Sequence, residues 1–98
     1  MNISTPVNAT TDATQTLTGT TIVALAADPY RAVLMLQAPA GAALLFSFTN
    51  NTVSAGATGC FSLAAASAPF IFGPNVPKGP LYVNGASGVA VILAGDTA

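Results

Sequence analysis

The segment Ala32-Val33-Leu34-Met35-Leu36-Gln37-Ala38 is followed by the turn residues Pro39-Ala40-Gly41 and by a second apolar run, Ala43 to Thr49. Successive side chains of a β-strand point to opposite faces of its sheet. One face of the second run would carry only large apolar side chains: Leu44, Phe46 and Phe48. This part of the chain therefore predicts two β-strands joined by a turn.

The stretch from Ala32 to Phe48 also comes closest to a membrane span. A transmembrane helix needs about 20 consecutive apolar residues. This stretch is shorter, contains Gln37, Pro39 and Gly41, and has no basic residue after it. We therefore interpret it as two strands and expect no membrane partner.

Short apolar runs separated by turn residues continue on both sides of these two strands. Further strands are expected at 21–26, 60–64, 69–72, 81–84 and 89–94. Turn signals between them include Asp28-Pro29, Asn50-Asn51 and the proline-rich loop 73–80. Regularly spaced short strands are typical of a sandwich or a barrel. We expect one all-β domain over residues 20–98, a small β-sandwich or β-barrel of about seven short strands.

The first 19 residues have a different composition from the rest. Ser, Thr, Asn, Asp, Gln and Gly dominate, and neither a helical nor an alternating apolar pattern persists. Such a segment lacks the apolar content to fold by itself. We expect residues 1–19 to form a polar, extended N-terminal arm that lies on a neighbouring subunit. Its expected anchors are the isolated apolar residues Ile3, Pro6, Val7 and Leu17.

Charge is almost absent from this chain. Five of the 98 residues are charged: Asp12, Asp28, Arg31, Lys78 and Asp96. In ordinary soluble domains, about a quarter of the residues are charged. Binding to nucleic acid needs clustered Lys and Arg, so we expect no nucleic-acid partner. A surface with so little charge does little to keep copies apart. It indicates a surface that is covered by copies of the chain or by a larger assembly.

The same composition removes most catalytic chemistry. The chain contains no His and no Glu, so a Ser nucleophile would have only Lys or Asp as its base. Three scattered Asp residues do not form a metal site, and the order around Lys78-Gly79 does not match a phosphate-binding loop. Cys60 has no cationic neighbour in sequence and is interpreted as a small apolar side chain. We expect neither an enzyme nor a cofactor.

A few other residues are candidates for a subunit contact. Arg31 follows the Asp28-Pro29 turn and is either a solvated turn charge or a planar donor that binds carbonyls or Asp28 at a subunit contact. Phe70 and Phe72 alternate with Ile71, so one of these two faces could be exposed in a single subunit. Core packing is the competing interpretation of the phenylalanines. Tyr82 is a further, weaker candidate for the interface.

Two segments carry a distinctive order of turns and strands. The first is Asp28-Pro29-Tyr30-Arg31 followed by Ala32-Val33-Leu34-Met35-Leu36-Gln37. The second runs from Pro69-Phe70-Ile71-Phe72-Gly73 through Val76-Pro77-Lys78-Gly79-Pro80-Leu81-Tyr82 to Gly88-Val89-Ala90-Val91-Ile92-Leu93. Together they resemble the small all-β head proteins of tailed bacteriophages, of the decoration (cement) and head-fibre type. One departure follows the last expected strand, which that family often ends with Glu or Lys, whereas this sequence has Ala94-Gly95-Asp96.

The resemblance implies a virion structural protein. Such a protein would bind the outer surface of a tailed-phage head, commonly as a homotrimer, and stabilise the head by bridging major capsid subunits. It would be found on the capsid surface, and in the host cytoplasm during assembly. A tail or fibre component is the alternative within the structural class. A carbohydrate-binding module is a third possibility, disfavoured because the chain has no Trp and only Tyr30 and Tyr82.

Overall fold

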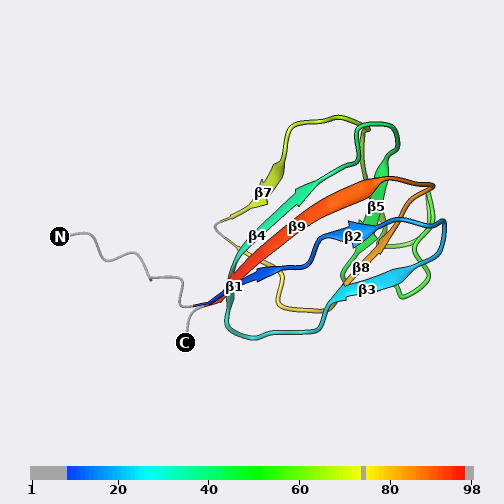
Figure 1. The fold of residues 1–98 in the computed structure, drawn as a ribbon. Coiled ribbons are helices and arrows are strands. Elements are labelled where there is room, and N and C mark those ends of the chain that lie inside the picture. The colour runs from blue at the N-terminus through cyan, green and yellow to red at the C-terminus, as the bar shows by residue number, and fades with distance from the viewer. Residues whose placement is uncertain (1–8, 74, 97–98) are drawn as a thin grey trace.

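The computed structural model describes residues 9–73 and 75–96, which form two antiparallel β-sheets packed face to face (Figure 1). Nine strands lie in this described part: β1 (Ala9–Asp12), β2 (Gln15–Thr16), β3 (Ile22–Leu25), β4 (Arg31–Gln37), β5 (Leu44–Ser47), β6 (Phe61–Leu63), β7 (Phe70–Phe72), β8 (Leu81–Asn84) and β9 (Val89–Asp96). The prediction of a small all-β sandwich is confirmed. Each of the seven expected strands corresponds to one of β3 to β9.

The two sheets have different strand orders. The first has the order β1-β9-β4-β7, and β2 also pairs with β9. The second has the order β3-β8-β5-β6. Within the described residues, no helix is both long enough and apolar enough to cross a membrane.

Residues 9–19 correct the prediction of an N-terminal arm over 1–19. β1 and β2 pair antiparallel with β9, so most of this segment forms an edge of the first sheet. An edge strand needs a partner for its backbone groups more than it needs apolar content. The eight-residue β9 provides that partner. Residues 1–8, with the expected anchors Ile3, Pro6 and Val7, lie outside the described residues.

Leu17 is a core residue of its own domain, so its assignment as a contact with a neighbouring subunit was wrong. Its side chain is 3% exposed, and its backbone N–H donates to Gly88 O at 2.8 Å. Ala13, at the break between β1 and β2, is also buried and donates to Ile92 O at 2.8 Å. A polar segment therefore joins the core through two inward-pointing apolar side chains.

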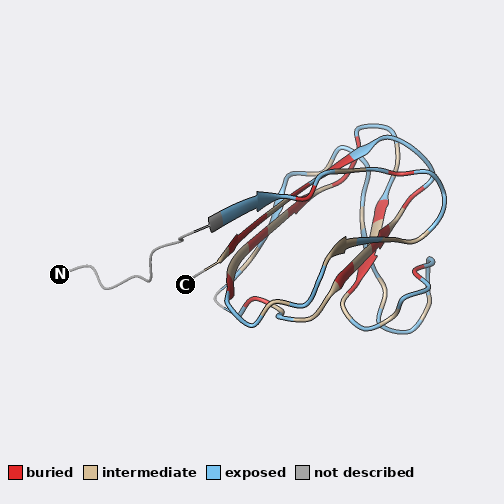
Figure 2. Cartoon of the chain, turned by 60° about the horizontal axis from the view of Figure 1, so that its bottom comes forward, coloured by how far each residue is buried: buried red, intermediate tan, exposed pale blue. Residues whose placement is uncertain are grey.

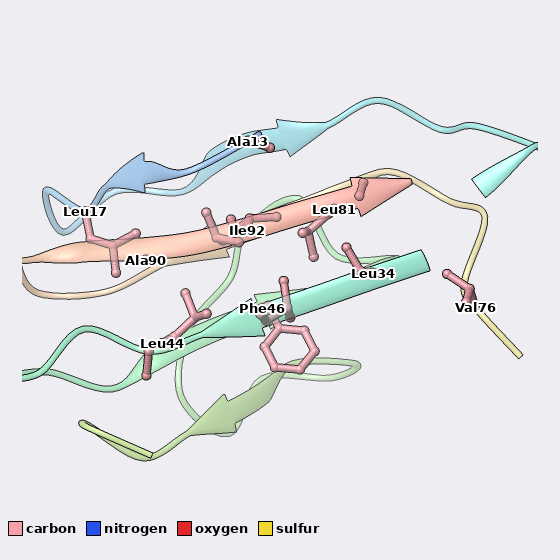
Figure 3. Packing of buried hydrophobic residues seen from close by; sticks show 13 residues of the cluster. Ala13, Leu17, Leu34, Leu44, Phe46, Val76, Leu81, Ala90 and Ile92 are labelled. Atoms are coloured by element: carbon pink, nitrogen blue, oxygen red, sulfur yellow. The ribbon is translucent and has the colours of Figure 1, made fainter. Parts of the chain in front are cut away.

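The core lies between the two sheets (Figure 3). β4 and β9 contribute every second residue from one side: Leu34, Leu36, Ala90, Ile92 and Ala94. The opposing strands β5 and β8 contribute Leu44, Phe46, Leu81 and Val83. Figure 2 shows this buried layer inside the sandwich, with β1 and most loops exposed. The remaining residues of these strands consequently face outward.

Candidate interaction surface

Arg31 is buried at one end of the sandwich, where β4 begins, and only 1% of it is exposed. Its Nη1 atom donates to Pro77 O and to Gly79 O, both at 2.8 Å. Its Nη2 atom donates to Ala26 O, also at 2.8 Å. The planar guanidinium can hold several carbonyls at once because its N–H groups form a fixed fork.

The turn at Asp28 and the loop 77–79 bind each other in both directions. The Asp28 N–H donates to Lys78 O at 2.8 Å, and Lys78 Nζ donates to Arg31 O. The Tyr30 N–H donates to Asp28 Oδ1 at 2.9 Å, which fixes the turn itself. The interpretation of Arg31 as a solvated charge was wrong. It does bind carbonyls, as expected, but they belong to its own chain and its side chain is too buried to reach a partner.

Four of the five charged residues gather at this end of the sandwich: Asp28, Arg31, Lys78 and Asp96. The Tyr30 N–H, and then a hydrogen bond with Asp96, hold the pKa of Asp28 below its ordinary value. That same bond raises the pKa of Asp96. Burial lowers the pKa of Arg31. In the described part of the chain, no group of three or more His, Cys, Asp or Glu side chains could hold a metal ion.

The outer face of the first sheet is mostly apolar, with Gln37 of β4 and Thr10 and Asp12 of β1 as its polar side chains, and no segment of the described chain covers it. We call it the open face and define it by six side chains: Val33, Met35, Ile71, Val89, Val91 and Leu93. Met35 lies in register between Ile71 and Leu93, so these residues form a row across three strands. Ile71 is 64% exposed, and Val89 and Val91 are exposed as well.

A shallow hollow interrupts the open face near the end of β9. It has a volume of about 230 Å³ and is lined by Thr10, Val33, Met35, Leu93, Ala94 and Gly95. Gly95 lies in register with Thr10 and Val33 and has no side chain to fill the space between them. The hollow is therefore apolar, apart from the Thr10 hydroxyl at its border.

The outer face of the second sheet is covered by the chain itself over β5 and β8. Ser47 alternates with core residues on β5, and its Oγ accepts the N–H groups of Thr49 at 3.2 Å and Asn50 at 2.9 Å. Asn84 Nδ2 donates to Val53 O at 2.8 Å, and Val53 is fully buried. The loop between β5 and β6 thus lies over this sheet. On the second sheet, the outer face stays exposed at Val23 on β3, whereas the outer face of the first sheet is open across β4, β7 and β9.

All five phenylalanines of the chain form one connected cluster beside β6 and β7. Phe46 is buried at its centre and stacks on Phe61 at 5.5 Å between ring centroids. Phe72 contacts Phe46, Phe48 and Phe70 edge-to-face, the last at 4.8 Å. Phe61 and Phe70 are 58% and 44% exposed. We call these two rings the Phe edge.

The three aromatic residues expected at an interface, Phe70, Phe72 and Tyr82, therefore lie in three different environments. Phe72 packs against the core, in line with the competing interpretation, whereas Phe70 remains half exposed. Tyr82 is half-buried on the covered sheet, in register with Ser47 and Val23. Of these three residues, Phe70 is thus the most accessible to a partner.

Sequence reasoning missed the open face, although a signal for it was present. The segments of β4 and β9 are apolar at nearly every position, whereas a strand with one solvated face alternates. Continuous apolar strands indicate a sheet covered on both sides. The second cover is not part of the described chain.

No protein-family model, no curated protein and no solved structure matches this chain. The described surface has three distinctive features: the open face, the Phe edge and the charges gathered at one end. The first two are apolar, and the third is engaged in internal hydrogen bonds.

Proposed function

We propose that the chain is a capsid decoration protein that binds the outer surface of a tailed-phage head and bridges its major capsid subunits. One observation carries the proposal. Four of the five charges interact with one another at one end, and six large apolar side chains are exposed elsewhere on the described surface: Val23, Phe61, Phe70, Ile71, Val89 and Val91. Such a surface suits a protein that is covered by other proteins. The resemblance of segments 28–37 and 69–93 to phage head proteins supplies the identity of the assembly.

The Phe edge is the proposed contact with the capsid. Phe61 and Phe70 are held in place by rings behind them, so binding would order few additional rotamers. Aromatic side chains at the centre of an interface commonly dominate its binding energy. The backbone edges of β6 and β7 are poor sites for strand addition, since each strand has only three residues and Pro69 precedes β7. Attachment through side chains is therefore favoured.

Heads purified without the protein, from the phage that encodes it, provide the test. Labelled protein is mixed with these heads, and bound protein is quantified after sedimentation. The double variant Phe61→Ser/Phe70→Ser should lose most of its occupancy while its circular dichroism spectrum stays unchanged. Val23→Ser, which alters an exposed apolar residue of the second sheet, is the matched control and should bind normally. Wild-type protein that binds tails but not heads would overturn the capsid assignment.

A further inference from the structure

We propose that the open face binds the open face of a second copy of this chain, in a two-fold symmetric pair. This contact is separate from the Phe edge and does not depend on the capsid assignment. It pairs two copies, whereas the resemblance to phage head proteins implies a homotrimer. The six apolar side chains of the open face surround one apolar hollow. Stacked sheets pack about 10 Å apart with interdigitating side chains, so a second sheet is a natural cover for such a surface.

The positions of Val91 and Gly95 favour a second copy as the occupant. Both lie on the outer side of β9, two residues before and two residues after Leu93. A two-fold axis that passes over Leu93, between the sheets and perpendicular to β9, therefore brings each Val91 over the Gly95 of the other copy. An exposed valine then enters each hollow, and two equivalent contacts form at once.

The area of the open face is that of a weak, transient contact. β9 and β4 extend about 26 Å and about 23 Å, the shorter β1 and β7 extend about 13 Å and about 10 Å, and neighbouring strands lie about 4.8 Å apart. The face thus offers about 350 Å² per copy, or about 700 Å² per pair, which is less than a stable interface buries. We expect a reversible dimer with a dissociation constant of about 0.1 mM.

The charge distribution agrees with this choice. Asp12, in register with Leu93, is the charged side chain at the rim of the open face. The six residues that define the face are uncharged and offer no ionic recognition to a charged partner. The axis over Leu93 places the two Asp12 side chains opposite each other at the rim, where both remain exposed to solvent. Gln37, in register with Val91, is a polar side chain beside the valine on this face. The contact therefore rests mainly on shape and apolar burial.

Sedimentation equilibrium of the full chain tests the proposal. The wild type should reach twice the 9.6 kDa chain mass, and Val91→Asp should raise the dissociation constant at least about tenfold. Val23→Asp changes a valine on the other sheet that is even more exposed (60% against 39% for Val91) and should leave the dimer intact. A wild-type monomer at about millimolar concentration, or a dimer insensitive to Val91→Asp, would overturn the proposal.

Cysteine crosslinking provides a second readout that does not depend on the folding of the Val91 variant. In a Cys60→Ser background, Leu93→Cys places two thiols on opposite sides of the two-fold axis, and because stacked sheets lie about 10 Å apart, a short bismaleimide crosslinker, rather than a direct disulfide, should link the dimer. Val23→Cys in the same background is the control and should remain uncrosslinked. Equal crosslinking at both positions, or none at position 93, would contradict the two-fold arrangement.

Discussion

Arg31 Nη1 donates to Gly79 O at 2.8 Å across a separation of 48 residues. This bond ties the start of β4 to the loop that leads into β8, and hence the first sheet to the second. The same guanidinium holds Pro77 O and Ala26 O, so three loop carbonyls depend on one side chain. The turn at residues 28–31 and the loop 77–79 therefore meet at this residue.

Replacement of Arg31 should strongly destabilise the domain. Arg31→Met leaves three carbonyls without their donor, and we expect a loss of about 2–4 kcal/mol in the free energy of unfolding. Arg31→Lys should lose nearly as much, because one ammonium cannot reproduce the planar fork. Urea denaturation measures both. Lys78→Met, which removes the more exposed cation of this end, should cost less than about 1 kcal/mol, and an equal loss there would contradict the role assigned to Arg31.

Gly85 is required because Leu17 lies directly against it. A Cβ atom at position 85 would lie 2.4 Å from Leu17 Cδ1 and 2.9 Å from Ala43 O. Gly85→Ala should therefore cost about 1–3 kcal/mol through overpacking. Leu17→Ala should cost about 2–5 kcal/mol by opening a cavity in the core.

The double variant separates these two effects. Removing the Leu17 side chain relieves the closer of the two clashes, so Gly85→Ala should cost less in the Leu17→Ala background than alone. Chemical denaturation of the four proteins completes the cycle. Strict additivity would show that the two residues do not share the space that the structure assigns to them.

Truncation distinguishes the two parts of the N-terminal segment. Deleting residues 1–8 should leave the domain folded, because every strand and every core residue named above lies beyond them. Deleting residues 1–18 removes β1, β2, Ala13 and Leu17 and exposes one side of β9. The longer deletion should unfold or strongly destabilise the domain. Circular dichroism with thermal melting measures both, and a stable 19–98 fragment would restore the arm interpretation.

The sequence predicted the strands that are marked by apolar runs and turn residues. It did not predict the strands that form only through backbone pairing with a neighbouring strand. β3 to β9 follow from short apolar stretches between Pro, Gly and Asn turns. β1 and β2 consist mainly of Thr, Asp and Gln and form only because β9 presents an unpaired edge. Arg31 shows the same limit, since no local pattern reveals carbonyls that lie 46 and 48 residues away.

Stability should depend on pH in two opposite ways. The pKa of Asp96 is raised from 3.8 by its bond with Asp28, so the folded state binds more protons and loses stability as pH rises through that raised pKa. The pKa of Asp28 is lowered from 3.8, chiefly by the Tyr30 N–H, so stability is lost as pH falls through the lowered pKa. Denaturation midpoints should therefore pass through a maximum in the acidic range.

Replacing each Asp by Asn identifies the carboxyl group that causes the loss of stability on each side of the pH maximum. Asp96→Asn should be more stable than the wild type at neutral pH and should flatten the loss on the alkaline side of the maximum. Asp28→Asn should weaken the loss on the acidic side, where Asp12 also contributes through its bonds from Thr14. An unchanged alkaline limb in Asp96→Asn would exclude the carboxyl pair as its cause.

Salt should strengthen the proposed dimer. Asp12 is in register with Leu93, so an axis over Leu93 places the Asp12 side chains of both copies at the same rim. Two exposed like charges repel weakly, and the repulsion is screened as ionic strength rises. The dissociation constant should fall a few-fold between about 20 mM and about 500 mM NaCl. Asp12→Asn should bind tighter at low salt and lose this dependence.

Asp28→Asn is the matched control, since Asp28 lies with the other charges at the end of the sandwich and away from the row of Leu93. It should retain the salt response of the wild type. Sedimentation equilibrium of the three proteins at both salt concentrations gives the comparison. A dimer that dissociates as salt is added would require attraction between charges, which this register of β1 against β9 does not provide. The two-fold axis would then have to lie elsewhere than over Leu93.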